Sequence, residues 1–192
     1  MGHIERKQRE RENTKNSILK AALDIAIAEG WTAVTIRRIS EKIEYTTSIV
    51  YSHFENKEAL LLEIVDQGFE KLYKYIMKSL KNEDDPKKQI MIVSLANWDF
   101  AMTNRELYNL MFNLNRPSGD NATKGMQIIE DIFFQYTGKS RDEVEHIVLN
   151  WICLRRGCLN LLIDFSMQDK ETDSRQLYIE FMSRFIYSIT PN

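Results

Sequence analysis

Hydroxyl, imidazole and ammonium groups gather between residues 46 and 57, where together they can hydrogen-bond a polar, anionic partner. They belong to Thr46, Thr47, Ser48, Tyr51, Ser52, His53 and Lys57. Small hydrogen-bonding side chains are what a helix needs in order to lie in the major groove of DNA and touch base edges. A nearby lysine suits a backbone phosphate. The stretch therefore predicts a DNA contact, and because residues 46–54 lack Arg and Asn, it does not predict which bases are contacted.

Two short helices joined by a tight turn are expected to position these groups. The first spans about residues 35–42, with Thr35 as its N-cap. The hydroxyl groups of residues 46–48 mark the start of the second helix. Both helices have an apolar side, made of Ile36, Ile39 and Ile43 in the first and Ile49, Val50 and Phe54 in the second. The polar groups then lie on the outer side of the second helix.

A longer helix is predicted to precede this pair, over about residues 13–29, with Gly30 as its C-terminal stop. Its apolar residues recur at helical spacing, at Ile18, Ala21, Ala22, Ile25 and Ala26. We expect Trp31, Val34 and Tyr45 to complete a small core, because a unit of three short helices has few apolar residues to spare.

The first twelve residues are charged, of mixed sign, and without apolar periodicity. One interpretation is a solvated, frayed helix start or a disordered arm, which the interleaved glutamates favour. The other is an arm that reaches DNA phosphates or a minor groove, as arms do in other DNA-binding folds. Its cations would be Arg6, Lys7, Arg9 and Arg11.

Residues 14–65 resemble the DNA-binding domain of the TetR family of transcriptional regulators. The matching letters are AALDIAIAEGWTAVT and then ISEKIEYTTSIVYSHFENKEALL, in the order and spacing of the family pattern. The most specific part is the series Tyr51, His53, Phe54, Lys57 and Leu60. Two positions depart from the pattern, since Glu44 and Ser48 stand where the family usually has glycine. If Glu44 adopts a positive φ, the turn costs roughly 1 kcal/mol.

The resemblance implies a role for each matching position. Arg37, in the supporting helix, would contact the DNA backbone or a base edge. Recognition-helix positions fall on Thr46, Thr47, Ser48 and Ser52. Tyr51 and His53 match positions that bind phosphate, as does Lys57, whose charge a helix N-terminus would reinforce.

The rest of the chain is predicted to be helical as well. A helix capped by Asn56 or Glu55 runs to about Leu80, and Pro86 suits the first turn of the next, over about 86–103. A shorter helix (about 105–114), a loop at 116–125 and a further helix follow. SRDE at 140–143 has the form of a capping box, and Thr172 or Asp173 opens the last helix.

These elements predict an all-α protein of about nine helices in two domains. Residues 1–60 would form a three-helix helix-turn-helix DNA-binding domain, and residues 61–192 a larger helical domain for ligand binding and dimerisation. Because no flexible linker is apparent, the boundary is expected inside the helix that starts near residue 57.

Aromatic and methionine side chains cluster in the predicted second domain, where they suit a pocket for an apolar or aromatic effector. The candidates are Trp98, Met102, Tyr108, Met111, Phe112, Met126, Phe133 and Trp151. An ordinary helical core is the alternative for each of them. The last two long helices carry more apolar surface than one small domain can bury, which predicts pairing with a second copy. The interface candidates are Leu154, Gly157, Cys158, Leu161, Phe181 and Phe185.

Composition narrows the classes of function. The net charge is −2. Residues 1–57 hold ten Lys/Arg and eight Asp/Glu, which gives this segment a net charge of +2. Residues 58–192 hold sixteen Lys/Arg and twenty Asp/Glu, which gives a net charge of −4. A basic end on an acidic chain suits a protein that touches DNA at one end.

Cys153 and Cys158 are expected to be free, buried thiols in a reducing cytoplasm, with a thiol sensor as the alternative.

Catalysis and membrane insertion are not expected. The histidines, at positions 3, 53 and 146, are too scattered for a helical metal pair, and neither a nucleophile elbow nor a phosphate loop is present. No apolar run reaches the ~18 residues of a membrane span, and the N-terminus lacks a signal-peptide core. We therefore expect no enzyme, metal or cofactor. The expected function is a dimeric regulator, a repressor released from its DNA operator by a small molecule, with a DNA-binding regulator or scaffold that lacks effector response as the alternative.

Overall fold

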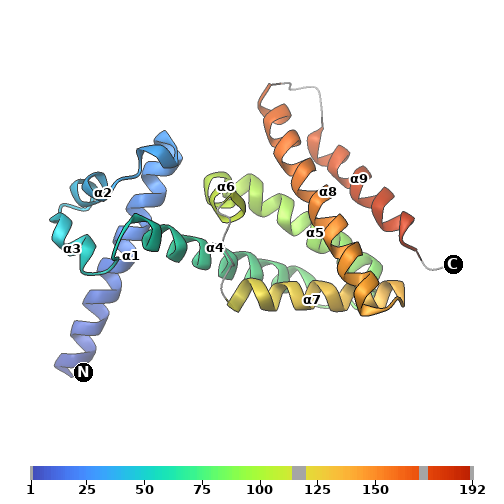
Figure 1. Ribbon diagram of the computed structural model, residues 1–192, viewed down its shortest axis with the longest axis horizontal. Coiled ribbons are helices and arrows are strands. Elements are labelled where there is room, and N and C mark those ends of the chain that lie inside the picture. The colour runs from blue at the N-terminus through green and yellow to red at the C-terminus, as the bar shows by residue number, and fades with distance from the viewer. Residues whose placement is uncertain (1, 114–119, 169–172, 191–192) are drawn as a thin grey trace. The chain divides into compact units, whose positions relative to one another are not determined.

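The protein is all-α, as predicted. The computed structural model describes residues 2–113, 120–168 and 173–190, and of residues 3, 113, 120–121 and 163–168 only the backbone. Within these ranges it contains nine α-helices, one 3-10 turn and no strand (Figure 1). The helices are α1 (His3–Glu29), α2 (Ile36–Lys42), α3 (Thr47–Tyr51), α4 (Lys57–Leu80), α5 (Pro86–Thr103), α6 (Arg105–Asn113), α7 (Asp120–Thr137), α8 (Arg141–Gln168) and α9 (Ser174–Ser188), with η1 (Trp31–Ala33) after α1.

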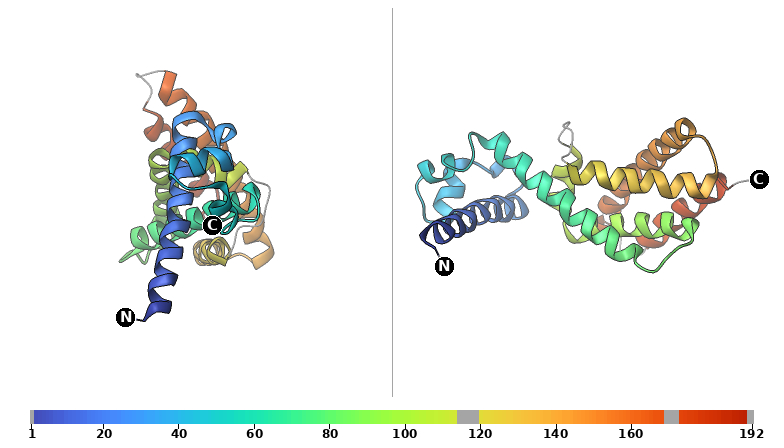
Figure 2. Two further views of the ribbon diagram at one scale, coloured as in Figure 1. Left: turned by 90° about the vertical axis from the view of Figure 1, so that its left-hand side faces the viewer. Right: turned by 90° about the horizontal axis from the view of Figure 1, so that it is seen from below.

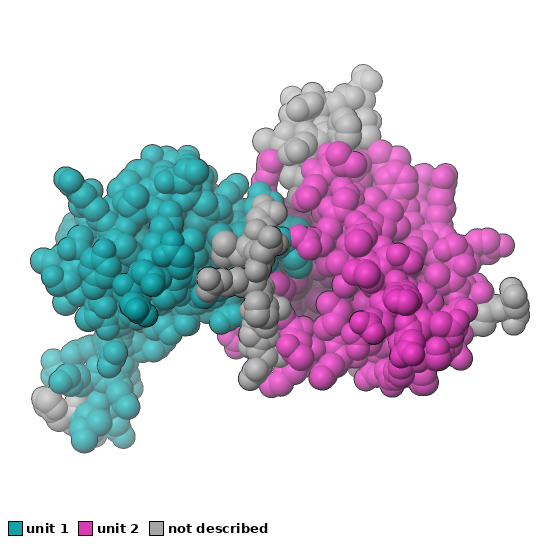
Figure 3. All heavy atoms as spheres, viewed as in Figure 1, with its two compact units in different colours: residues 1–68, 106–116 teal, residues 69–105, 117–192 magenta. Residues whose placement is uncertain are grey.

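The chain divides into two compact units, shown in two colours in Figure 3. The first unit comprises residues 1–68 and 106–116, and the second comprises residues 69–105 and 117–192. The division after Gly68 falls inside α4, the helix in which the domain boundary was expected, although later than residue 60. The sequence did not predict that α6 belongs to the first unit.

Apolar residues of α1, α2 and α3 form the core of the first unit. Ile18, Ile39 and Val50 are completely buried. In this unit α2 packs against α1 and α3 packs against α2 (Figure 1). Gly30 ends α1 at φ 81°, where its N–H donates to the Ala26 carbonyl at 2.8 Å. Tyr45 does not join this core, because its side chain is 52% exposed.

The N-terminal lead is helical and not a disordered arm. α1 is continuous from His3 to Glu29, so it extends about ten residues beyond the predicted start. Pairs of side chains four residues apart support the exposed turns, such as Arg6 with Glu10 at 2.9 Å. The charged lead lacks apolar periodicity because these turns carry no core residue.

Two close contacts attach α6 to the rest of the first unit. The indole Nε1 of Trp31 donates to the carbonyl of Glu106 at 3.0 Å. On α4, a Cβ added to Gly68 would lie 2.7 Å from the Met111 sulfur and 3.1 Å from a Leu107 methyl carbon. Because Gly68 has no side chain, α4 and α6 can approach each other closely at this position.

In the second unit α5, α7, α8 and α9 pack against one another (Figure 2). The predicted helix starts are confirmed. Asp85 caps α5 by accepting from the Lys87 N–H at 2.9 Å, ahead of Pro86. Ser140 and Glu143 form the reciprocal bonds of a capping box at α8. Asp173 caps α9.

The predicted loop at 116–125 is wrong in its second part, because α7 already begins at Asp120. The other part, residues 116–119, lies outside the described residues. The prediction for the two cysteines is wrong for one of them. Cys158 is buried, which raises the pKa of its thiol, whereas Cys153 is exposed, and both are free thiols.

A polar network crosses the centre of the second unit. Ser94 of α5 accepts from the Trp151 indole at 3.0 Å through its hydroxyl, and from the Tyr178 hydroxyl at 3.0 Å through its carbonyl. One helical turn further along, Asn97 accepts from the Arg155 guanidinium at 2.6 Å. All five side chains are buried. The network thus ties α5 to both α8 and α9.

Candidate nucleic-acid interface

The turn between α2 and α3 has the geometry of a helix-turn-helix. Thr35 caps α2 by accepting from the Arg38 N–H at 3.2 Å, as predicted. Glu44 then adopts a positive φ of 59°, so that the Tyr45 N–H reaches back to the Ser40 carbonyl at 3.0 Å. The strain expected for a non-glycine residue at this position, roughly 1 kcal/mol, is therefore present.

The outer side of α3 is polar and accessible. Thr46, Thr47, Ser48 and Ser52 are all exposed, and the Tyr51 ring is 55% exposed. On the other side Val50 is completely buried, which fixes how the helix is rotated about its axis. The sequence placed Ser52 and His53 on this helix, whereas α3 ends at Tyr51 and both residues directly follow it. Ser52 donates its hydroxyl to the Ile49 carbonyl at 2.7 Å.

Two of the predicted cationic contacts lie on the neighbouring helices. Arg37 is exposed on α2 and pairs with Glu41 at 2.8 Å. Lys57 is the first residue of α4, whose N-terminus is capped by Asn56 accepting from the Ala59 N–H at 2.8 Å. The Lys57 ammonium donates to the Trp31 carbonyl at 3.4 Å. It therefore stands where the helix dipole adds to its positive charge.

His53 faces α1. The side chain is half-buried next to the Phe54 ring, and its ring centroid lies 6.5 Å from that of Phe54. Burial lowers the pKa of His53, and the charges of Arg11 and Lys15 lower it further, against an opposing effect of Glu12. The imidazole is therefore held in a positive environment that α1 supplies.

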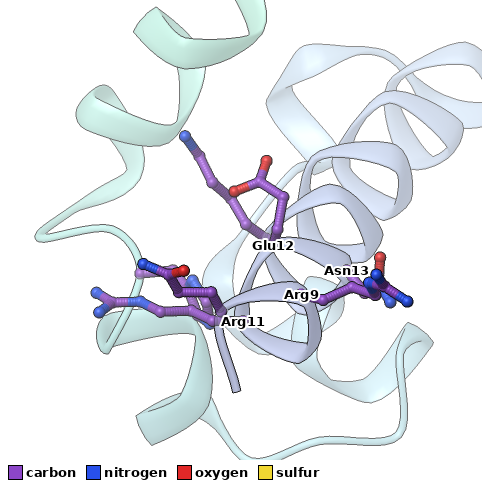
Figure 4. Close-up of a pocket in the computed structure, with 7 residues that line it drawn as sticks. Arg9, Arg11, Glu12 and Asn13 are labelled. Carbon is purple, nitrogen blue, oxygen red and sulfur yellow. The ribbon is translucent and has the colours of Figure 1, made fainter. Parts of the chain in front are cut away.

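A cleft between α1 and His53 was not predicted from the sequence. It is lined by Gln8, Arg9, Arg11, Glu12, Asn13, Lys15 and His53 (Figure 4). The signal that could have found it is the spacing of residues 8, 11, 12 and 15, which puts them on one face if the helix continues through them. The charged lead has no apolar periodicity, so the sequence alone did not indicate that the helix continues through these positions.

The structure does not bring all predicted effector-pocket residues together. Tyr108, Met111 and Phe112 belong to α6 in the first unit, and the other five belong to the second unit. Among those five, Phe133 and Trp151 pack with ring centroids 5.7 Å apart and are almost completely buried. Trp98 packs against Tyr178 in the same way at 5.0 Å, whereas Met102 is 45% exposed and Met126 half-buried.

The second unit has a different hollow, of about 640 Å³, between the start of α5 and the end of α9. Its apolar lining comes from Met91, Ile186 and Tyr187. Its polar lining comes from Asp85, Lys87, Lys88, Ser183 and Arg184. None of the predicted pocket residues contributes to it. Sequence periodicity cannot find such a site, because the site lies where the ends of two helices meet.

The predicted interface residues differ in their exposure. Gly157, Leu161 and Phe181 are exposed, Leu154 and Phe185 are half-buried, and Cys158 is buried. A Cβ added to Gly157 would meet nothing within 4 Å. Leu154, Gly157 and Leu161 follow one another at helical spacing, so α8 presents a continuous apolar strip with an open position in its middle.

Two classes of site receive no support from the part of the chain that the structure describes. There, no group of three or more His, Cys, Asp and Glu side chains is arranged to hold a metal ion. None of the described helices is long and apolar enough to cross a membrane.

Comparisons with known proteins agree with this geometry. Residues 18–64 match the model of the family described as bacterial regulatory proteins, tetR family. The repressor NicS of Pseudomonas putida is 23% identical over 117 residues, which cover 61% of this chain and 55% of NicS. The activator FasR of Mycolicibacterium smegmatis is 22% identical over 102 residues, covering 53% of this chain and 47% of FasR. The chain thus spans about half the length of the curated relatives that it matches.

The fold of the whole chain also recurs in solved structures. A TetR variant from Acinetobacter baumannii AYE, solved in complex with minocycline, superposes with a TM-score of 0.71 at 12% identity. The superposition covers 90% of this chain and 94% of the TetR variant. The matched family residues contain the turn at Glu44, the exposed side of α3 and the start of α4. Residues 18–64, which contain the helix-turn-helix, are thus similar to the DNA-binding segment of the tetR family, and the fold of the whole chain is similar to that of solved TetR-family structures.

Proposed function

We propose that this chain is a ligand-responsive repressor that binds a pseudo-palindromic operator as a homodimer and is released by a small apolar or aromatic effector. The observation that carries the proposal is the exposed, hydroxyl-bearing side of α3 beside the cation at the start of α4. An operator is the partner that such a surface fits, because base edges and phosphates are both hydrogen-bonding.

On DNA, each group would have a separate task. The hydroxyls of Thr46, Thr47 and Ser48 would face base edges in the major groove. Tyr51 and His53 would bind phosphates, together with Lys57, whose position at a helix N-terminus favours an anion. Phosphate contacts fix the register of the helix and base contacts select the sequence.

A dimer is supported by the apolar strip on α8. Leu161 is 63% exposed, and Phe181 on α9 is exposed as well. Exposed apolar side chains at helical spacing, with an open glycine between them, suit a second copy that packs helix against helix. Two recognition helices about 34 Å apart would then enter successive major grooves.

Effector response is supported by the way the chain passes between the units. α4 is continuous across the division after Gly68, and α6, which contacts Trp31 in the first unit, follows α5 directly. A ligand that favours one arrangement of α5 and α6 would therefore act on the DNA-binding unit through covalently continuous elements. That a related fold binds minocycline supports ligand binding here.

A second candidate function is a DNA-binding regulator or scaffold without effector response. The dense packing of Trp98, Phe133 and Trp151 favours it, because side chains this deeply buried leave little room for a ligand. The hollow between α5 and α9 favours the first candidate instead.

Thermodynamic linkage distinguishes the two candidates. A panel of apolar and aromatic small molecules is screened by thermal shift, and each stabilising compound is titrated into the complex of the protein with DNA from upstream of its own gene. We expect at least one compound to lower DNA affinity, and the DNA to lower the affinity for that compound by the same factor. Ligand affinity that is unchanged by saturating operator would contradict the proposal and favour the second candidate.

A further inference from the structure

The cleft between α1 and His53 combines three features that point to an anionic ligand. It is open to solvent, its lining contains three cations and one carboxylate, and it lies beside the residues that follow the recognition helix. The cations are Arg9, Arg11 and Lys15 and the carboxylate is Glu12, which gives the lining a charge of +2 with His53 neutral. The Glu63 carboxylate that pairs with Lys15 reduces the local charge to +1. None of these three features involves the α3 side chains that are proposed to face the major groove.

The helical path of α1 determines which side chains reach His53. Gln8, Arg11, Glu12 and Lys15 lie on one face, because their spacing is i, i+3, i+4 and i+7. Figure 4 shows Arg11 and Arg9 leaving α1 on opposite sides. A substitution of Arg11 therefore removes a positive charge on the side of α1 that faces His53 and leaves the Arg9 side chain in place.

Lys15 holds this part of α1 in place. Its ammonium pairs with Glu63 of α4 at 2.8 Å, and both side chains are about two-thirds covered. Since α4 also begins at Lys57, α1 is attached to the helix that carries a predicted phosphate contact. The cleft is thus part of the same rigid arrangement as the helix-turn-helix and not an independent flexible arm.

The environment of His53 is consistent with the charge of the lining. Burial is the main cause of the lowered pKa of the imidazole, and the charges of Arg11 and Lys15 lower it further, against an opposing effect of Glu12. An anion that enters the cleft would face Arg11 and the ring together, and its charge would offset both the burial and the repulsion. The amides of Gln8 and Asn13 add neutral donors to the lining.

We propose that this cleft binds a backbone phosphate of the operator, so that α1 makes a DNA contact of its own, centred on Arg11. The inference rests on the proposed operator binding and adds a contact on the helix before the helix-turn-helix. A phosphate contact carries no sequence information, so the cleft would strengthen binding to every duplex and leave the preference between sequences unchanged.

The test compares two cations of α1 that carry the same charge. The full-length variants Arg11→Gln and Lys20→Gln are titrated by fluorescence anisotropy on duplexes from upstream of the gene and on a scrambled duplex, at several salt concentrations. Lys20 is a matched control, because it is exposed on the same helix, pairs with Asp24 and does not line the cleft. Both side chains are exposed, so neither change is expected to affect folding.

Loss of one phosphate contact has a defined signature. We expect Arg11→Gln to reduce the slope of log affinity against log salt by about 1, and to weaken the upstream and scrambled duplexes by the same factor. Lys20→Gln should retain the wild-type slope. Equal slopes for the two variants would overturn the contact at the cleft.

Tyr51→Ala separates this inference from the function on which it rests. If the wild-type chain binds and Tyr51→Ala binds weakly while Arg11→Gln behaves as wild type, only the α1 contact is wrong. If the wild-type chain binds neither the upstream nor the scrambled duplex, the proposed function fails and the α1 contact fails with it.

Discussion

The two compact units differ in which side chains they expose and which they bury. In the first unit the recognition helix exposes hydroxyl groups and buries Val50. In the second unit Ser94, Asn97 and Arg155 are buried, whereas Leu161 and Phe181 are exposed. A surface tends to match its partner, so the first arrangement suits hydrogen-bonding DNA and the second suits the apolar surface of another protein copy.

The buried polar groups of the second unit also differ from the exposed ones in what they do. Asn97 uses its amide twice, donating to the Val93 carbonyl at 2.8 Å and accepting from Arg155 at 2.6 Å. The Arg155 guanidinium lies 4.9 Å from the centre of the Trp151 ring. Asn97 is thus bonded within α5 and to α8, and such buried polar bonds favour one packing of these two helices over others. In the first unit, the hydroxyl-bearing residues Thr47 and Ser48 of α3 are exposed.

The largest effect is expected at the exposed apolar strip of the second unit. Leu161→Glu would place a carboxylate in the proposed dimer interface, where an unpaired buried charge costs about 3 kcal/mol or more. The dimer dissociation constant should therefore rise more than a hundredfold, as measured by sedimentation or by light scattering after size exclusion. Operator binding should weaken with it, because one protomer holds one recognition helix.

Leu149→Glu is the matched control for that change. Leu149 is 55% exposed on the same helix, and it lies outside the predicted interface set. This variant should remain a dimer. Dissociation by both changes, or by neither, would contradict the contrast between the two faces of α8.

A smaller effect is expected at the two non-glycine residues with positive φ, one in each unit. Glu44 has φ 59° in the helix-turn-helix, and Asn82 has φ 70° between α4 and α5. Glu44→Gly should stabilise the fold by about 0.5 kcal/mol, since relief of the strain exceeds the extra entropy of an unfolded glycine. Asn82→Gly should change stability less, because asparagine tolerates this region.

Urea unfolding followed by circular dichroism compares the two substitutions. The informative result is which variant gains more free energy of unfolding, since both replace a residue of positive φ with glycine. A destabilised Glu44→Gly would show that the glutamate side chain contributes more at this turn than its backbone costs.

The sequence predicted the first unit well because its signals are local. The cap at Thr35, the buried positions Ile39 and Val50, and the strained turn at Glu44 each follow from residues a few positions apart. Helix starts in the second unit, near Pro86, Ser140 and Asp173, were predicted for the same reason. All of these depend on capping and periodicity, which a single sequence contains.

The predictions that were wrong or incomplete concern features that depend on packing between residues far apart in the sequence. Tyr45 is exposed although it was expected to join the core, and α1 begins at His3, about ten residues before the predicted start. Apolar residues at helical spacing predicted that Trp98 and Trp151 are interior, but not whether they line a pocket or pack against Tyr178 and Phe133. The hollow at Met91 and Tyr187 joins residues almost a hundred positions apart.

The most direct test of the central claim measures operator binding by fluorescence anisotropy, on DNA from upstream of the gene and at several salt concentrations. The wild-type chain is compared with Tyr51→Ala and Lys57→Ala, and with Tyr187→Ala as a matched exposed tyrosine of the second unit. We predict specific binding at physiological salt that weakens in the first two variants and is unchanged in the third. Weak, sequence-independent binding that neither Tyr51→Ala nor Lys57→Ala alters would contradict the assignment of α3 and the start of α4 as the DNA-binding surface.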